Sequence, residues 1–198
     1  DYLFRFACYH TESNQYLFIN FHHIIFDGSS ANIFFSSLSK LYHQLIINDS
    51  LTLKPLTYDY FDFAYWQRNY LDKLIRKQTS YWANQLRSIE NLNLPLDYER
   101  PTEQAHQGKK IIYALPKQWT MELTHVATQI DCTPFHFLLT TFFVMLYQLS
   151  NQKMLAASIP TKGRYTNELE PIIGFFISNV IVDFEVNLNK SFSQLIHT

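Results

Sequence analysis

The chain has 198 residues, of which 47% are hydrophobic and 17% are aromatic, and its formal net charge at pH 7 is −1. This composition suits one or two domains with a large buried core and argues against a disordered chain. Because there is no basic excess, it also argues against a nucleic-acid partner.

The first elements predicted along the chain are a β-hairpin and a helix. Residues 2–8 and 15–21 are rich in aromatic and β-branched side chains and flank the polar turn 11–14, which is typical of two paired strands. A helix is predicted over residues 30–47, where apolar side chains recur at helical spacing. Pro55 marks a linker after this helix.

A long helix is predicted over residues 58–87. Its aromatic and leucine side chains recur at helical spacing, which favours simple core packing: Phe63, Trp66, Tyr70, Leu74, Tyr81 and Leu86. A proline-containing loop over residues 92–107 follows, and then a strand over residues 109–115. Pro116 starts a helix that we expect to run to about residue 130.

The last third of the chain predicts a buried helix, two strands and the start of a further helix. Thr133 and Pro134 have the residue types of an N-cap and a first helical position, so a helix is expected over residues 134–149. Its apolar run is too short and too interrupted by polar residues to span a membrane. Strands are predicted over residues 154–159 and 177–186, and a helix from Phe192 onward.

The two cysteines, Cys8 and Cys132, lie far apart in the sequence and make no disulfide framework. We interpret them as buried thiols in a reducing compartment, and we expect a cytoplasmic protein.

The most informative segment is HHIIFDG, residues 22–28, which closes a strand and opens a helix. Because side chains alternate along a strand, His23 continues the apolar face of Ile19 and Phe21, whereas His22 points the other way. Burial on this face favours a neutral imidazole, which can accept a proton or a hydrogen bond. His23 is therefore the candidate catalytic residue, and a structural hydrogen bond is favoured for His22.

Two other interpretations of the histidines were weighed. A single histidine on an apolar strand face is usually a core residue, but a second histidine, an Asp and a Gly at this spacing make that interpretation weaker. Metal binding is disfavoured, because adjacent strand histidines point apart and no other His or Cys cluster has ligand spacing.

The motif HHIIFDGSS resembles the HHxxxDG motif of condensation domains of nonribosomal peptide synthetases, within the chloramphenicol-acetyltransferase-like acyltransferases. Further stretches resemble family motifs in the family's order, and together they cover essentially the whole chain. They lie at residues 58–67 (YDYFDFAYWQ), 81–86 (YWANQL), 94–108 (LPLDYERP to Gly108) and 163–176 (GRYTNELEPIIGFF). Two departures stand out: Ser29 occupies a position where the family often has Trp, and Asn179 is displaced by one residue from the family's Asn.

The resemblance implies an α/β fold of the chloramphenicol-acetyltransferase type, with two lobes that are α+β two-layer sandwiches. We expect both lobes to be incomplete, so that the chain is an internal fragment of the domain. Residues 1–55 would form the C-terminal part of the first lobe, with the motif, and residues 56–198 the N-terminal part of the second.

The implied activity is amide-bond formation between a donor acyl or peptidyl thioester and an acceptor aminoacyl thioester. Both would be carried on phosphopantetheine arms of carrier proteins, with an adjacent adenylation domain and no directly bound cofactor. His23 would act as a base or position the amine, and Gly28 would allow close backbone approach at the helix entrance. Ser178 and Asn179 are candidates for lining the substrate tunnel. In the family, the counterpart of Asp27 pairs with an Arg of an early segment that is absent here, so this pairing cannot be assigned to Arg5 or any other Arg of this chain.

Four alternatives remain open to different degrees. Cyclising relatives carry Asp where His22 stands, and epimerising relatives usually have Ser-Trp where this chain has Ser30-Ala31, so both are disfavoured. An acyltransferase that uses coenzyme A thioesters, such as a wax-ester synthase, is disfavoured by the later motifs. A degenerate domain that only docks carrier proteins is disfavoured by the intact HHIIFDG.

Overall fold

The computed structural model describes residues 2–48, 50–103 and 107–198. The chain divides into two compact units, one formed by residues 1–81 and 158–180 and the other by residues 82–157 and 181–198. Both helices and strands occur along the chain, which agrees with the predicted α/β class. The first change between these units along the chain falls after residue 81, not after residue 55, where the sequence placed the end of the first lobe. These units are not the two lobes of the expected fold, so the assignment of lobes stays a prediction.

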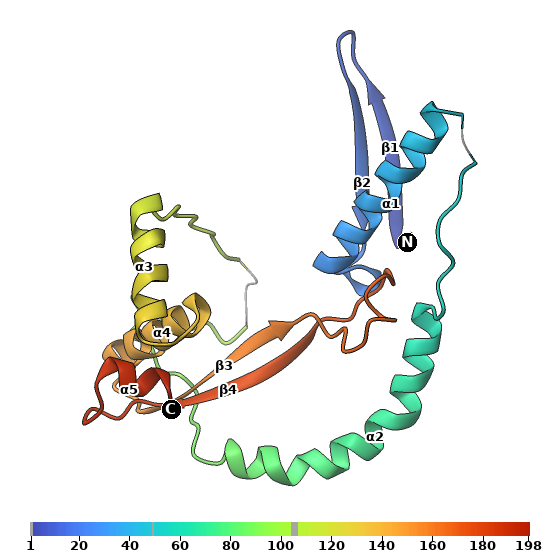
Figure 1. The fold of residues 1–198 in the computed structure, drawn as a ribbon. Helices are drawn as coiled ribbons and strands as arrows, with labels where there is room; N and C mark the ends of the chain where they lie inside the picture. The colour runs from blue at the N-terminus through green and yellow to red at the C-terminus, as the bar shows by residue number, and fades with distance from the viewer. Residues whose placement is uncertain (1, 49, 104–106) are drawn as a thin grey trace. The chain divides into compact units, whose positions relative to one another are not determined.

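The first unit begins with a hairpin and a helix beside it. Strands β1 (Phe4–His10) and β2 (Gln15–Phe21) pair antiparallel, with Phe4 opposite Phe21, and the Thr11 N–H closes the turn on the Asn14 carbonyl at 2.8 Å. Helix α1 (Gly28–Ile46) lies alongside this hairpin, as Figure 1 shows. The Phe34 ring of α1 contacts the hairpin through Phe6 and Phe21, at ring-centroid distances of 6.1 and 5.2 Å. The predicted hairpin and helix are therefore confirmed.

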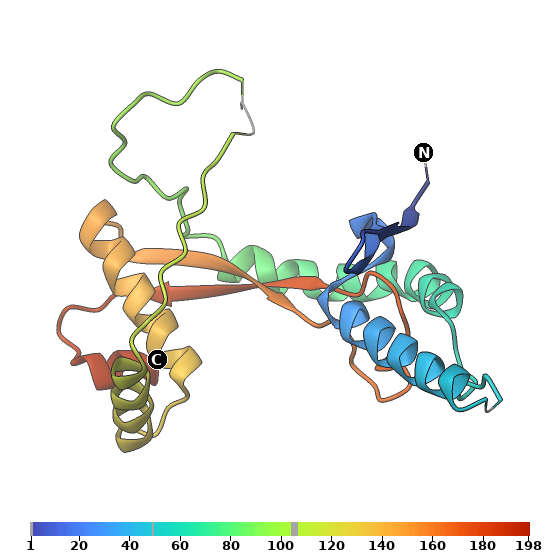
Figure 2. The same ribbon diagram turned by 90° about the horizontal axis from the view of Figure 1, so that it is seen from above.

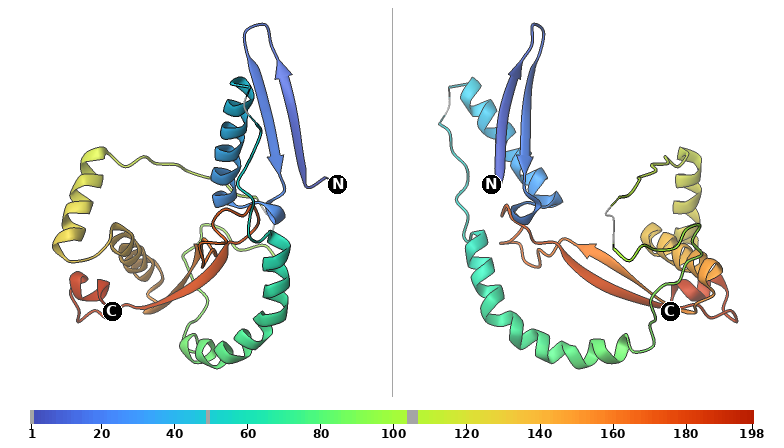
Figure 3. Two further views of the ribbon diagram at one scale, coloured as in Figure 1. Left: turned by 45° about the vertical axis from the view of Figure 1, so that its right-hand side comes forward. Right: turned by 180° about the vertical axis from the view of Figure 1, so that it is seen from behind.

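The hairpin is a two-stranded ribbon (Figure 3) that leaves large apolar side chains exposed. Phe4, Leu17 and Phe18 are each more than half exposed. Cys8 is also exposed and Cys132 is only half-buried, so the expectation of two buried thiols is wrong. A sheet of two strands has too little width to cover its own side chains, which explains the exposure of Cys8 on β1.

Helix α2 (Tyr60–Gln85) confirms the predicted long helix. Its start is fixed reciprocally, because the Asp59 carboxylate accepts the N–H groups of Phe61 and Asp62, at 2.8 and 3.0 Å, while the Asp62 carboxylate accepts the Asp59 N–H at 2.9 Å. This is the arrangement of a capping box.

The prediction that the aromatic and leucine side chains of α2 pack in a core is wrong for most of them. Phe63 is buried, but four of the others are 43–60% exposed: Trp66, Tyr70, Leu74 and Tyr81. Helical spacing indicates which side chains share a face but not whether a partner covers that face. Phe63 is buried because it packs against Ile172 and Phe176 of the irregular segment 162–177, which we call the 162–177 loop.

The described residues of the second unit include α3, α4, α5, the end of α2 and parts of β3 and β4, whose ribbon can be followed in Figure 2. Helices α3 (Lys117–Gln129) and α4 (Pro134–Ser150) are bent by 97° relative to each other, and α5 (Phe192–Ile196) follows. The Thr133 hydroxyl accepts the His136 N–H at 3.2 Å, and Pro134 occupies the first turn of α4, as predicted. Strands β3 (Met154–Thr161) and β4 (Ser178–Glu185) confirm the two predicted strands.

Strands β3 and β4 run in opposite directions. The Val186 N–H donates to the Lys153 carbonyl at one end, and the Thr161 hydroxyl donates to the Ser178 carbonyl at the other. The core of the second unit consists of Phe143, Leu146, Leu155 and Val186, all nearly inaccessible to solvent. α5 is held to this unit by its Phe192, whose ring contacts Phe137 at 5.1 Å.

The strand predicted over residues 109–115 is wrong. This segment has no regular structure, and Ile111 and Ile112 are 93% and 81% exposed. A β-rich sequence forms a strand only when another strand satisfies its backbone groups, and no described strand pairs with this segment. The loop predicted at 92–107 has no helix or strand in its described part, and its residues 104–106 lie outside the described residues.

In the described part of the chain, no helix by itself has the length and apolar character needed to cross a membrane. The bent pair α3 and α4 meets that criterion together, by length and composition alone.

Candidate functional site

The HHIIFDG motif begins one residue after β2 ends. The His22 N–H donates to the Leu3 carbonyl at 2.7 Å, and the His22 Nδ1 accepts the Ile24 N–H at 3.1 Å. When a side chain accepts a backbone N–H two residues ahead, that N–H cannot also bond to a neighbouring strand. Here the His22 side chain caps a 3₁₀ turn, His23–Ile25. The structural hydrogen bond expected for His22 is therefore present.

His23 does not lie on a buried strand face. It is the first residue of the 3₁₀ turn and is exposed, so the expectation of a buried imidazole is wrong. Side chains alternate between the two faces only within a strand, and β2 ends at Phe21, so this alternation does not predict the direction of His23. The imidazole meets the edge of the Phe175 ring at a centroid distance of 5.4 Å and an angle of 78°. Within the described residues no hydrogen bond occupies the ring, which leaves both nitrogens available to a substrate.

Asp27 is paired with Arg164, an assignment within this chain that the sequence had not allowed. The guanidinium of Arg164 donates to both carboxylate oxygens, Nη1 to Oδ2 at 2.8 Å and Nη2 to Oδ1 at 3.2 Å. Both side chains are inaccessible to solvent. Two parallel N–H···O bonds fix the orientation of both groups, which makes this a geometrically specific pair. It joins the start of α1 to the 162–177 loop.

Ser30 extends the Asp27–Arg164 pair into a buried polar cluster. Its hydroxyl donates to the Gly174 carbonyl at 2.8 Å and accepts the Gly174 N–H and the Arg164 Nη2–H at 3.0 and 3.1 Å. Its own N–H caps α1 by donating to the Asp27 carboxylate at 2.8 Å. The Phe176 N–H donates to the same carboxylate at 3.1 Å. The cluster of Asp27, Ser30 and Arg164 therefore fixes the loop against the helix at several backbone points.

The cluster keeps the Asp27 carboxyl ionised. Burial raises its pKa, but the Arg164 guanidinium and the N–H groups of Ser30 and Phe176 stabilise the anion more strongly, and together they lower the pKa from 3.8 to about 2. The Arg164 guanidinium also lies 4.3 Å from the centre of the Phe176 ring, which favours the cation.

A lowered pKa makes the cluster sensitive to acid. The stabilisation by the Asp27 carboxylate is complete above its ordinary pKa of 3.8 and is lost as the pH falls toward about 2. We expect the stability gap between the wild type and Asp27→Asn to shrink by about 1 kcal/mol between pH 6 and pH 3. Urea unfolding of both proteins at the two pH values measures this gap. A gap that stays constant would show that Asp27 does not titrate differently in the folded state.

Two glycines of the 162–177 loop allow it to approach its neighbours. Gly163 has φ +64°, and a Cβ at this position would lie 1.7 Å from the Phe176 carbonyl oxygen. A Cβ on Gly174 would lie 2.2 Å from the Tyr60 ring. Gly28, by contrast, is exposed, and an added Cβ would meet nothing within 4 Å among the described residues. No described residue uses the close approach expected at Gly28, and its role at the helix entrance stays a prediction.

Gly163→Ala should destabilise the cluster next to it. The left-handed backbone costs a non-glycine residue about 1–2 kcal/mol, and the clash with the Phe176 carbonyl adds to this cost. We expect a loss of at least about 2 kcal/mol in unfolding free energy, measured by urea denaturation. Gly108→Ala is the matched control, because a Cβ there meets open space. An equal effect of both substitutions would contradict the role of Gly163.

The tunnel-lining candidates Ser178 and Asn179 lie at the start of β4. The Ser178 hydroxyl accepts the Tyr165 O–H at 3.4 Å, which links it to the residue next to Arg164, whereas Asn179 is exposed. No contact joins either residue to His23 among the described interactions. Their role in lining a tunnel stays a prediction.

Sequence analysis missed several residues that build the site. Arg164 belongs to the GR pair of the 163–176 stretch, but its burial was not predicted. Ser30 was placed only at the start of a helix, and no role in the site was predicted for it. Tyr60 was also missed: its hydroxyl donates to the backbone carbonyl of Phe175 at 2.9 Å, and Phe175 is the residue whose ring contacts His23.

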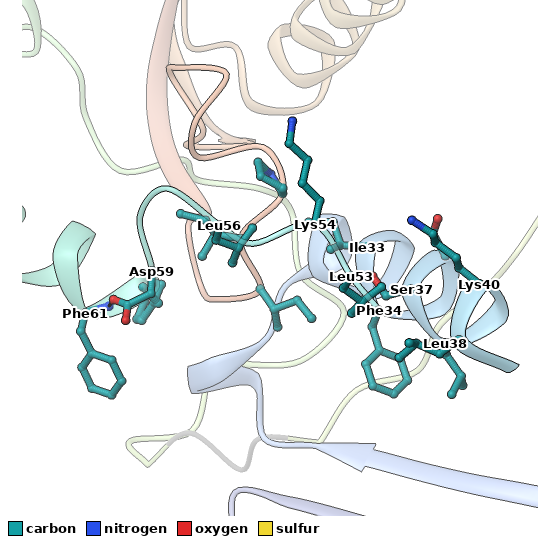
Figure 4. Close-up of a pocket in the computed structure, with 16 residues that line it drawn as sticks. Ile33, Phe34, Ser37, Leu38, Lys40, Leu53, Lys54, Leu56, Asp59 and Phe61 are labelled. Carbon is teal, nitrogen blue, oxygen red and sulfur yellow. Dashed lines mark hydrogen bonds between the residues drawn. The ribbon is translucent and has the colours of Figure 1, made fainter. Parts of the chain in front are cut away.

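A groove of the first unit lies along α1 (Figure 4). It has a volume of about 720 Å³ and is formed by α1, the segment 53–61 and residues 171–173. Its lining includes Phe34, Leu38 and Leu56, with the charged side chains Lys40, Lys54 and Asp59. None of the predicted site residues lines it. Among the described residues, no group of three His, Cys, Asp or Glu side chains could hold a metal ion.

The fold is that of a known class of domains. The epimerization domain from the third module of tyrocidine synthetase B superposes with a TM-score of 0.80 at 23% sequence identity, over 98% of this chain and 45% of that one. At this identity the likeness establishes the fold alone, which is the chloramphenicol-acetyltransferase-like α/β fold expected from the sequence.

The family follows from the sequence. The family model of the Condensation domain matches residues 1–198, and the chain belongs to this family. Gramicidin S synthase 2 of Brevibacillus brevis is 32% identical over 197 residues, which are 98% of this chain and 4% of that protein. Phosphinothricin tripeptide synthetase PhsC of Streptomyces viridochromogenes is 32% identical over 187 residues, 93% of this chain and 17% of that protein. The chain thus spans a small part of the length of these relatives.

Proposed function

We propose that this chain forms part of a condensation domain that joins a donor acyl or peptidyl thioester to an acceptor aminoacyl thioester through an amide bond. The observation that carries the proposal is the presentation of His23, exposed and unoccupied, five residues before the helix start that the Asp27–Arg164 pair fixes. Membership of the Condensation family and the peptide-synthetase relatives support the choice of reaction.

In the proposed reaction, the acceptor amine attacks the thioester carbonyl and a tetrahedral oxyanion forms. The carbon–sulfur bond then breaks, the amide is formed, and the thiolate leaves with the proton that the amine loses. The His23 imidazole either takes this proton or holds the amine in position for attack. Asp27 does not contact the substrate in this scheme, because its carboxylate is occupied by Arg164 and two backbone N–H groups.

The substrates would arrive as phosphopantetheine thioesters on donor and acceptor carrier domains, with an adenylation domain in the same polypeptide. The cytoplasmic location expected from the sequence belongs to the same proposal. The experiment offers the complete synthetase one acyl group in two forms, on its carrier protein and on coenzyme A. We expect amide product from the carrier-bound donor and at least tenfold less from the coenzyme A thioester. The reverse preference would favour the coenzyme A acyltransferase, and no product from either would favour a docking domain.

Residues 1–198 expressed alone should not catalyse condensation. We expect the site to need walls from the rest of both lobes, and positioning supplies much of the rate in a direct attack. The exposed aromatic side chains of the hairpin should also promote self-association. The measurements are the oligomeric state of the expressed chain and its turnover with two loaded carriers. A monomer that works at the rate of the complete domain would refute the prediction.

A further inference from the structure

A second pocket of the first unit lies between the start of α2 and the 162–177 loop and has a volume of about 620 Å³. No residue of HHIIFDG lines it; its lining comes from the 58–67 and 163–176 stretches. Its lining combines aromatic rings with carboxylates, and these side chains are Tyr58, Phe63, Trp66, Tyr165, Asp62 and Glu168. A pocket of this size falls in the range that small-molecule sites occupy.

The aromatic base of the pocket is already held in place. Phe63 is buried and packs on Ile172 and Phe176, which gives the pocket a rigid base. The Trp66 ring stacks on Phe63 at a centroid distance of 6.0 Å and an angle of 30°. On the opposite side, the Tyr165 hydroxyl donates to Ser178. The Phe63 ring is therefore fixed before a ligand binds, whereas Trp66 and Tyr165 are 46% and 71% exposed and offer ring surface to it.

The charged side chains of the lining are both acidic. The Asp62 carboxylate accepts the Asp59 N–H, and hydrogen bonds from its own N–H and from Thr166 lower the pKa of Glu168. Neither carboxylate makes an ion pair with any Lys, Arg or His in the described residues. The pocket thus offers unneutralised negative charge next to electron-rich rings.

We propose that this pocket binds a small organic cation, an ammonium group carried on an apolar body. Ammonium groups are attracted to the faces of Trp and Tyr rings, and the carboxylates add charge complementarity. A bare metal ion fits less well, because aromatic rings are not ligands and two carboxylates leave its coordination incomplete. The inference is independent of the proposed condensation activity, because none of its residues is assigned a catalytic step.

The test is calorimetric titration of the complete protein with n-butylammonium chloride, with n-butanol as the neutral analogue of similar size. We expect saturable binding of one ammonium ion and at least tenfold weaker binding of the alcohol. Trp66→Leu and Glu168→Gln should each weaken the ammonium complex about fivefold, which is the size of one cation–π or charge contact. Asp62 is left intact because it caps α2.

The controls use the same substitutions outside the pocket. Trp119→Leu on α3 and Glu170→Gln in the same loop change exposed residues that do not line it, and binding should be unchanged. Tyr165→Leu tests the opposite wall in case Trp66→Leu does not fold. Equal binding of butanol and butylammonium would overturn the proposal, as would pocket variants that bind like the wild type. Binding of a lysine-rich peptide without binding of butylammonium would also overturn it, and would indicate a protein partner.

Discussion

Arg164→Met should lower the free energy of unfolding by about 3–5 kcal/mol, because it leaves the buried Asp27 carboxylate without its cation. Asp27 is 2% exposed and Arg164 7%, so water cannot replace the lost partner. For a chain of this size, such a loss corresponds to a melting temperature lower by roughly 10 °C. Asp27→Ala should act in the same way, because it leaves the guanidinium unpaired. Thermal and urea unfolding measure both effects.

The double variant Asp27→Ala/Arg164→Met separates pairing from simple loss of contacts. Because no uncompensated charge remains, its destabilisation should be smaller than the sum of the two single effects. Arg68→Met, on the exposed part of α2, is the matched control and should change stability by less than about 0.5 kcal/mol. Strictly additive effects would contradict the pairing. An unchanged melting temperature with lost activity in Asp27→Ala would make Asp27 a participant in the chemistry.

His23→Ala should reduce amide formation by the complete domain roughly a hundredfold or more, with little effect on folding. The side chain is exposed and makes no hydrogen bond among the described residues, so its removal costs the fold little. The rate is followed as single-turnover product formation between two loaded carrier proteins. His22→Ala should be milder for activity, because that ring bonds to the Ile24 N–H. A folded His23→Ala protein with the wild-type rate would remove His23 from the mechanism.

The sequence predicts most of the helices and strands because each is encoded locally. The capped start of α4 and the paired strands β1 and β2 follow from residue types a few positions apart. The strand at 109–115 failed for the opposite reason, because a strand needs a partner that its own sequence does not specify. The exposure of the α2 face beyond Phe63 likewise depends on what covers it.

The candidate site could be located but not assembled from the sequence. HHIIFDG identified His23 and Asp27, but strand alternation was extended past Phe21, where the His22 hydrogen bond already turns the chain. The partner of Asp27 lies 137 residues away, and no local pattern links the two. Gly163 was the nearest available signal, since it precedes Arg164 directly and has a left-handed backbone that favours glycine.

The most direct test of the central claim is the mass of the acceptor carrier protein after one turnover of the complete synthetase with both carriers loaded. If the domain forms amide bonds, the acceptor carrier should gain the mass of the donor acyl group, and the donor carrier should lose it. The same experiment with His23→Ala should leave both masses nearly unchanged over that time. An acceptor that keeps its mass while its aminoacyl group changes stereochemistry would contradict condensation and indicate epimerisation instead.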